Sequence, residues 1–284
     1  MALTVERTAR LRRIAADVRK LILETVHHAK AGHVGGPLSA TDMLVALYFE
    51  LMNIDPANPE WEDRDRFVLS KGHSALALYA VMAKRGYFPE EEMKTFDKLD
   101  SRLQAHPDMS VLPGLDMSTG SLGQGLSAAV GMALAAKLRG KDYVTYCMVG
   151  DGEIQEGQIW EAADIARRYR LDNLIVWMDN NKLQQYGWAA GENRRKPPVE
   201  EAERKWEAFG WNVISIDGHR YEEIVAADQA SRAHKGGPTV IVAHTVKGKG
   251  VSFMENAYLW HSRVPTDEEL AQAVIEIEAG VSHR

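Results

Sequence analysis

Only one cysteine, Cys147, occurs among the 284 residues of the sequence. A single thiol excludes an internal disulfide framework and agrees with a reducing compartment. Apolar runs are also short: Lys137 interrupts the longest small-residue segment, so none reaches the roughly 18 residues that a membrane-spanning helix needs. Glu6 and Arg7 lie where a signal peptide would need an apolar core. We therefore expect a cytoplasmic protein with no membrane partner, in which Cys147 is a small core residue.

Excess positive charge is lacking as well. Lys and Arg number 34 against 40 Asp and Glu, which gives a formal net charge of −6. This balance supplies no basic field for nucleic acid, and we expect no nucleic-acid partner. The sequence also lacks internal repeats, low-complexity segments and linkers rich in Pro, Gly or Ser. Its length suits one large domain, which we expect to occupy residues 1–284.

Helical and strand patterns alternate along the chain. Apolar residues recur at helical spacing from Leu11 to Val26, which predicts a long amphipathic helix over about residues 5–30. A second helix is expected from an N-cap at Ser39 through Phe49, a third from near Leu122, and a final one over 266–277. Apolar runs predict strands at 67–69, 143–149, 174–178, 213–216 and 239–243. The alternation indicates an α/β fold, with a mainly parallel sheet and helices on both faces.

Polar residues follow two of these predicted strands directly. The turn Gly150-Asp151-Gly152 follows one strand, and the pair Asn180-Asn181 follows the next. In a parallel sheet both groups lie at the same edge. A carboxylate from Asp151, an amide oxygen from Asn181 and a backbone carbonyl near Leu183 are ligands that suit Mg²⁺ bound to a diphosphate. Gly-Asp-Gly alone is typical of a tight turn, but the asparagine pair favours a metal site.

Several segments together resemble one enzyme family. Residues 150–183 resemble the thiamine diphosphate motif, and five further segments follow the order found in the amino-terminal half of transketolase. These segments are Ala31-Gly32-His33-Val34-Gly35-Gly36-Pro37, Ser70-Lys71-Gly72-His73-Ser74, Ala105-His106-Pro107-Asp108, Ser118-Thr119-Gly120-Ser121-Leu122-Gly123-Gln124-Gly125 and Trp260-His261-Ser262. The resemblance implies a thiamine diphosphate-binding fold, with thiamine diphosphate and Mg²⁺ as cofactors and a role in carbohydrate metabolism.

The resemblance also implies which residues contact the cofactor. Asp151, Asn181 and the Leu183 carbonyl would bind the metal. The loop that enters the small-residue helix would contact the cofactor, mostly through its backbone. The full set of expected cofactor contacts is His73, Gly120, Ser121, Leu122, Gly150, Gly152, Asn181 and His261.

Four of the ten histidines fall on family motifs. By resemblance, His73 and His261 lie near the diphosphate and the reacting carbonyl, His106 binds the first hydroxyl of the donor, and His33 contacts donor and acceptor hydroxyls. Imidazoles suit a reaction that makes and unmakes alkoxides near pH 7. Glu156 has two interpretations: an ordinary acidic residue in a first helical turn, or, by resemblance, part of a hydrogen-bonded network between two active sites.

One element of the family pattern is missing from the sequence. The glutamate that activates the cofactor belongs, in the family, to a pyrimidine-binding module, and neither that module nor a carboxy-terminal domain follows here. We therefore expect the amino-terminal, diphosphate-binding subunit of a split transketolase, active with a partner subunit as an α2β2 heterotetramer. The alternative is a truncated form of a longer enzyme.

The expected reaction is transfer of a two-carbon ketol group from a ketose, as a sugar phosphate, to an aldose. Alternatives are a subunit of a 2-oxo acid dehydrogenase or deoxyxylulose phosphate synthase, and a binding subunit that is catalytically silent. A Mg²⁺ nucleotide-binding protein is the alternative that we rank last, because no glycine-rich phosphate loop with a lysine is present. Ser262 and Arg263 replace the family's usual continuation of the last motif, so the sequence does not identify the particular ketose.

Overall fold

The computed structural model describes residues 3–186 and 196–282. Five strands form one sheet in the order β1-β2-β3-β5-β4, and every neighbouring pair is parallel. The strands are β1 Arg66–Leu69, β2 Thr145–Gly150, β3 Leu174–Asn180, β4 Asn212–Asp217 and β5 Thr239–His244. The predicted α/β class with a parallel sheet is therefore confirmed.

Alternate strand residues supply two separate cores, one on each face of the sheet. Tyr146 and Trp177 point to the face that carries most of the amino-terminal half of the chain, whereas Cys147 and Val176 point to the opposite face. All four side chains are fully buried. This period of two, with apolar residues on both sides, is typical of strands covered by helices on both faces.

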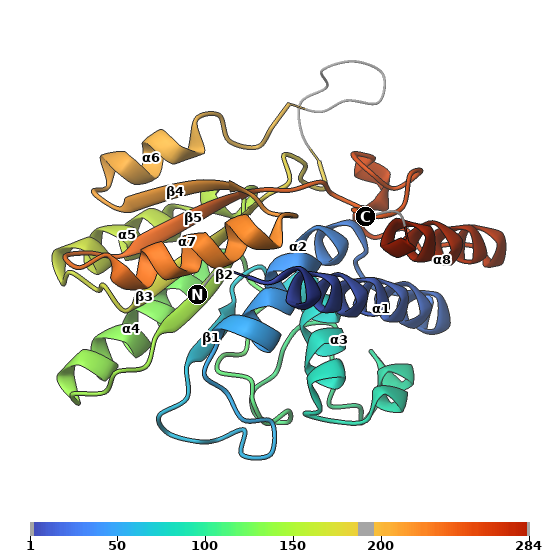
Figure 1. The fold of residues 1–284 in the computed structure, drawn as a ribbon, viewed down its shortest axis with the longest axis horizontal. Helices are drawn as coiled ribbons and strands as arrows, with labels where there is room; N and C mark the ends of the chain where they lie inside the picture. The colour runs from blue at the N-terminus through green and yellow to red at the C-terminus, as the bar shows by residue number, and fades with distance from the viewer. Residues whose placement is uncertain (1–2, 187–195, 283–284) are drawn as a thin grey trace.

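Eight α-helices cover the two faces within the described residues. On one face lie α1 Val5–Ala29, α2 Gly35–Ala46, α3 Ala75–Arg85, α7 Tyr221–Ala233 and α8 Asp267–Ser282. The other face carries α4 Gln124–Leu138, α5 Gly157–Arg168 and α6 Ala202–Ala208. Figure 1 shows α1, α2, α3 and α8 grouped at one end of the molecule. None of the described helices is long and apolar enough to cross a membrane.

The start of α2 differs from the prediction. Ser39 is not an N-cap but lies inside the helix, which begins at Gly35 and continues into a π-helical segment, Leu47–Leu51. Pro37 is tolerated in the first turn because backbone N–H groups there have no intrahelical partner. The Ser39 hydroxyl donates instead to the Gly36 carbonyl and to the carboxylate of Asp179, 2.9 and 2.7 Å away.

Other element boundaries shift by a few residues. The second strand begins at Thr145 instead of residue 143, because the Val144 N–H donates to the Asp65 carboxylate instead of entering the ladder. The small-residue helix begins at Gln124. The last helix extends to Ser282 rather than residue 277, and a reciprocal pair of hydrogen bonds between Thr266 and Glu269 closes its first turn.

Candidate active site

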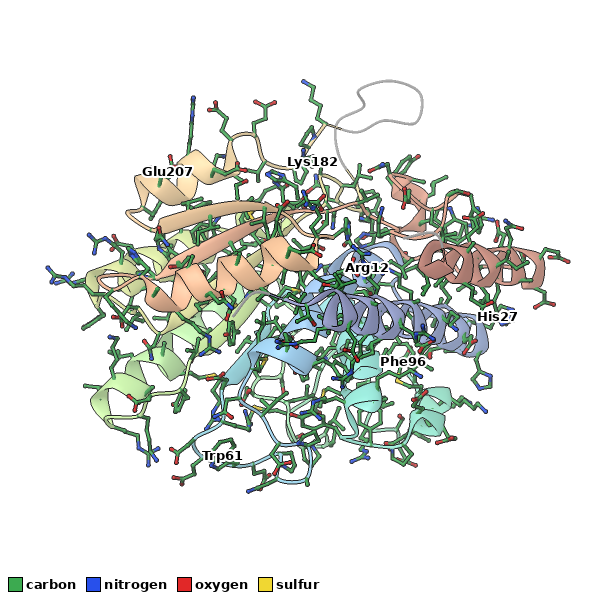
Figure 2. The ribbon with its side chains drawn as sticks, in the orientation of Figure 1. Arg12, His27, Trp61, Phe96, Lys182 and Glu207 are labelled. Atoms are coloured by element: carbon green, nitrogen blue, oxygen red, sulfur yellow. The ribbon has the colours of Figure 1, made fainter. Side chains whose placement is uncertain are left out.

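The carboxyl ends of β2 and β3 bring the two predicted polar groups together. Gly150 lies opposite Asp179 in the strand register, and the Asp151 N–H donates to the Asp179 carbonyl, 3.3 Å away. Asn181 follows β3 directly, and both Asp151 and Asn181 are buried. Figure 2 shows Lys182, the next residue, at this edge of the sheet. The parallel topology thus gathers ligand groups from two separate segments of the chain.

Asp151 is a buried carboxylate bonded to backbone. One oxygen accepts from the Gly152 N–H at 2.8 Å, and the other accepts from the Lys182 N–H. Burial and the nearby charge of Asp179 raise the pKa of Asp151 to about 7. Among the residues that the structure describes, no lysine, arginine or histidine forms an ion pair with it. Its environment therefore favours a bound cation.

A second buried carboxylate, Asp179, is fully compensated. It is inaccessible to solvent and forms an ion pair with the ammonium of Lys71, itself only 2% exposed. Ser39, Thr245 and Asn181 also donate to its oxygens. Burial acts to raise the pKa of Asp179, but the charge and hydrogen bond of Lys71 outweigh it and lower the pKa below its usual range. This network fixes Asn181 through its amide nitrogen, while the amide oxygen of Asn181 accepts from the Leu183 N–H at 3.1 Å.

A second lysine, Lys247, reaches the same place from the segment after β5. Its Nζ lies 3.0 Å from the Leu183 carbonyl and 2.8 Å from His261 Nδ1. Burial lowers the pKa of Lys247 to about 8, and Lys71 acts in the same direction, while Asp151 opposes it. Two buried cations beside a carboxylate and an amide oxygen form a mixed-charge site, which suits an anion bound together with a metal ion.

Three histidines, His33, His73 and His261, form a histidine cluster. Ring centroids lie 5.1 Å apart for His33–His73 and His33–His261, and 5.4 Å apart for the stacked pair His73–His261. The Val34 N–H donates to the His261 carbonyl at 3.0 Å, which ties two of these segments together. The cluster therefore combines residues that precede α2, follow β1 and lie near the carboxyl end of the chain.

The histidine cluster is neutral at pH 7. Burial lowers the pKa of His33 to about 4, of His73 to about 2 and of His261 to about 3. Neighbouring groups add to this effect, chiefly Lys71 for His73 and Lys247 for His261. Neutral imidazoles can each donate one hydrogen bond and accept another, so the cluster can hold and exchange protons with hydroxyl groups.

These groups line one cavity of about 600 Å³. Among the predicted site residues, those that line it are His33, His73, His106, His261, Glu156, Gly120, Leu122, Gly150, Asp151, Gly152, Asn181 and Leu183. Ser121 is exposed and does not line the cavity. Gly120 packs against His106: a Cβ built on Gly120 would lie 3.3 Å from the imidazole ring.

Glu156 does not lie in a first helical turn, contrary to that interpretation of the sequence. Residues 153–155 form a short 3₁₀ turn, and Glu156 is the extended residue that precedes α5. Its exposed side chain packs by its Cβ against Gly123, whose φ of 84° requires glycine. An exposed acid at the cavity edge remains available to a neighbouring chain.

Four charged groups of this site are not predicted by the sequence patterns. They are Lys71, Glu153, Asp179 and Lys247. Glu153 is 2% exposed and joins three segments, because it accepts hydrogen bonds from Ser70, Gly123 and Gly150. Lys71 belongs to one of the recognised motifs and Asp179 ends an apolar strand, so charge at these otherwise buried positions is the signal that could reveal them.

Comparison with known proteins identifies the class to which this α/β protein belongs. Residues 11–279 match the family model described as "Transketolase, thiamine diphosphate binding domain". The chain belongs to this transketolase family. The expected resemblance to the amino-terminal half of transketolase is confirmed, and the other types of thiamine diphosphate enzyme are not favoured.

Individual relatives agree with the family assignment. A 6-deoxy-6-sulfo-D-fructose transketolase subunit of Clostridium sp. (strain MSTE9) is 50% identical over 261 residues, covering 92% of this chain and 94% of the relative. An apulose-4-phosphate transketolase subunit of Phocaeicola vulgatus is 43% identical, covering 91% and 90%. The transketolase of Campylobacter jejuni superposes with a TM-score of 0.86 at 34% identity, covering 94% of this chain and 42% of that one.

Proposed function

We propose that this chain is the diphosphate-binding subunit of a thiamine diphosphate- and Mg²⁺-dependent transketolase. The complete enzyme would transfer a two-carbon ketol group from a ketose to an aldose. The observation that carries the proposal is the single cavity in which Asp151, Asn181 and two buried lysines meet the neutral histidine cluster. Similarity to transketolase subunits of nearly the same length supports it.

The residues present fit a magnesium ion. Asp151 is a buried carboxylate whose pKa is raised because the protein does not fully compensate its charge. The amide oxygen of Asn181 accepts one hydrogen bond, from the Leu183 N–H, and keeps a lone pair for a metal. Leu183 lines the same cavity, and its carbonyl, which accepts from the Lys247 ammonium at 3.0 Å, has a second lone pair for a metal. These three oxygens belong to the hard ligand class that Mg²⁺ prefers, and the remaining positions would go to diphosphate oxygens and water. We infer that they hold the metal.

The residues around the metal site also fit a diphosphate. Lys71 and Lys247 bring two ammonium groups into a region that excludes water, where charge-assisted hydrogen bonds are strong. Gly150 and Gly152 leave the backbone open to the ligand on the same side. When bound, thiamine diphosphate supplies a carbanion centre that can attack a ketose carbonyl and accept the electrons of the broken carbon–carbon bond.

The protein's contribution to the chemistry is positioning and proton transfer. Neutral His33, His73 and His261 can donate to or accept from ketose hydroxyls without first losing a proton. His106 is exposed at the cavity wall, where an incoming sugar would meet it. We assign His73 and His261 to the diphosphate and the reacting carbonyl. His33 is assigned to donor and acceptor hydroxyls, and His106 to the donor's first hydroxyl.

We further propose that residues 1–284 form one domain and that a partner subunit completes the active site. This chain covers 42% of the Campylobacter jejuni transketolase. The partner would bring the pyrimidine-binding module and the carboxy-terminal domain, in an α2β2 assembly in which Glu156 connects two sites. The relatives are named for a sulfonated and a phosphorylated sugar, which supports a sugar phosphate or a similarly anionic ketose as substrate. A cytoplasmic location fits this metabolism.

The proposal is tested by purifying the tagged chain with its partner from the source cells. Ketol transfer is then measured with and without thiamine diphosphate and Mg²⁺. We expect transfer that requires both cofactors, and loss of transfer in Asp151→Asn although the partner still copurifies. Asp100→Asn is the matched control, because Asp100 is exposed and its φ of 62° is well tolerated by asparagine. A copurified partner with no cofactor-dependent transfer would refute the proposal.

A further inference from the structure

A half-buried histidine outside the cavity contacts the chain segment that carries Lys247. His219 lies between β4 and α7 and does not line the cavity described above. Its Nδ1 is 2.7 Å from a carboxylate oxygen of Asp42, and its Nε2 accepts from the Val246 N–H at 2.9 Å. Because a backbone N–H can only donate, Nε2 carries no proton, and Nδ1–H must donate to Asp42. The two contacts fix one tautomer of His219.

Asp42 is a rigid support for this histidine. Two nitrogens of Arg19 donate to its two oxygens at 3.2 and 2.6 Å, and the Tyr221 hydroxyl donates at 3.2 Å. The carboxylate is buried, and Arg19 together with His219 holds its pKa far below the usual range against the effect of burial. Asp42 therefore stays ionised and joins α1, α2 and the start of α7 at one point.

The contact with Val246 falls in a segment where three successive residues are each held by a different part of the chain. Thr245 donates to Asp179, Val246 donates to His219, and Lys247 reaches the Leu183 carbonyl and His261. Lys247 is 1% exposed, so its side chain has little room for another path into the cavity. The Lys247 carbonyl also accepts from the Asn256 N–H, and the Gly248 N–H donates to the Gly35 carbonyl, so the contact at Val246 fixes the amino-terminal side of Lys247.

We propose that His219 is a positioning residue that places Lys247 in the active site. Its Nε2 holds the backbone one residue before Lys247, and Asp42 holds the imidazole in the tautomer that makes this possible. The hydrogen bond from the Val246 N–H to Nε2 is the one that positions Lys247. The hydrogen bond from Nδ1 to Asp42 acts indirectly, because it keeps Nε2 unprotonated and able to accept. The inference about position stands on the chain alone, whereas its effect on cofactor binding rests on the function proposed above.

Two substitutions separate the two contacts of His219. Glutamine can place an amide oxygen near Nε2 and keep an acceptor for Val246, while asparagine can place an amide nitrogen near Nδ1 and keep the donor to Asp42 only. Hydrogen exchange of the full chain, followed by mass spectrometry, reports protection of residues 245–248, with β3 as an internal control. We expect His219→Gln to retain near wild-type protection, and His219→Asn to exchange about tenfold faster in this segment alone.

Each variant tests whether the hydrogen bond between Val246 and His219 holds residues 245–248 in place. Equal, wild-type protection in both variants would overturn the proposal, and so would fast exchange of residues 245–248 in His219→Gln with β3 still protected. If His219→Asn also exposes β3, the comparison of His219→Gln with wild type remains decisive. In the assembled enzyme, we expect about tenfold weaker thiamine diphosphate binding for Asn and recovery for Gln. An inactive wild-type assembly would count against the proposed function and leave the exchange result intact.

Discussion

Lys71→Met tests the buried charge network most severely. The substitution keeps the length and apolar stem of the side chain but removes the ammonium group that forms the ion pair with Asp179. Ser39, Thr245 and Asn181 would still donate to the carboxylate, which has no accessible surface. Removing one partner of a buried ion pair costs about 3–5 kcal/mol, because the other charge stays in a region of low polarity.

The sign of the pH dependence follows from Asp179. In the wild-type chain its pKa lies below the usual 3.8, so its contribution to stability is present above about pH 4 and is lost as the pH falls through the folded-state pKa. Without Lys71, burial dominates and raises the pKa of Asp179 above its unfolded value. Stability of the variant then falls as the pH rises through that pKa. The deficit relative to wild type should therefore be larger at pH 8 than at pH 5.

Urea denaturation of the isolated chain at both pH values, followed by circular dichroism, measures this difference in unfolding free energy. The double variant Lys71→Met/Asp179→Asn should recover most of the stability at pH 8, since no buried charge is left unpaired. A deficit under about 1 kcal/mol at pH 8, or one that is the same at pH 5, would refute the argument. So would a double variant no more stable than the single one.

Three further predictions concern the cavity and its frame. Asp151→Asn should stabilise the isolated chain above pH 7. A carboxyl whose pKa is raised to about 7 in the folded state lowers the unfolding free energy as the pH rises from about 4 to about 7, and asparagine does not ionise. If the unfolding free energy from urea denaturation changes with pH equally in the variant and the wild type, the prediction is wrong. The C2 protons of the histidine cluster should not titrate between pH 5 and 8 in NMR spectra, and a midpoint near 6.5 for any of the three would show that burial does not keep it neutral. Gly72→Ala should lower the melting temperature, since its Cβ would lie 2.8 Å from the backbone nitrogen of Gly120, whereas Gly131→Ala, in open space on α4, should raise stability by up to about 1 kcal/mol. Equal effects of the two alanines would argue against the close packing at Gly72.

The fold, and the meeting of Asp151 and Asn181 at one edge of the sheet, could be predicted because their signals are local. Apolar runs mark the strands, and the rule that parallel strands end at one edge places Asp151 beside Asn181 without any knowledge of contacts. The histidines were found by motif, and the structure brings His33, His73 and His261 within about 5 Å of one another. Neither step required information about side-chain packing.

The pairing of the charged groups in the site could not be predicted, because each pair joins residues far apart in the sequence. Lys71 and Asp179 are 108 residues apart, and a buried lysine looks like a surface lysine until its partner is known. Ser39 was misread for the same reason: a serine before an apolar run favours an N-cap, but here its hydroxyl serves a carboxylate 140 residues away. His219 lies outside the recognised motifs, and its contact with Val246 appears only in three dimensions.

The central claim is that this edge of the sheet holds a metal–diphosphate. The most direct measurement is anomalous diffraction from crystals of the chain with its partner, grown with thiamine diphosphate and Mn²⁺ in place of Mg²⁺. The account predicts one manganese peak coordinated by the side chains of Asp151 and Asn181 and by the Leu183 carbonyl, with the diphosphate beside Lys71 and Lys247. A manganese peak away from these oxygens, or cofactor density outside this cavity, would contradict it.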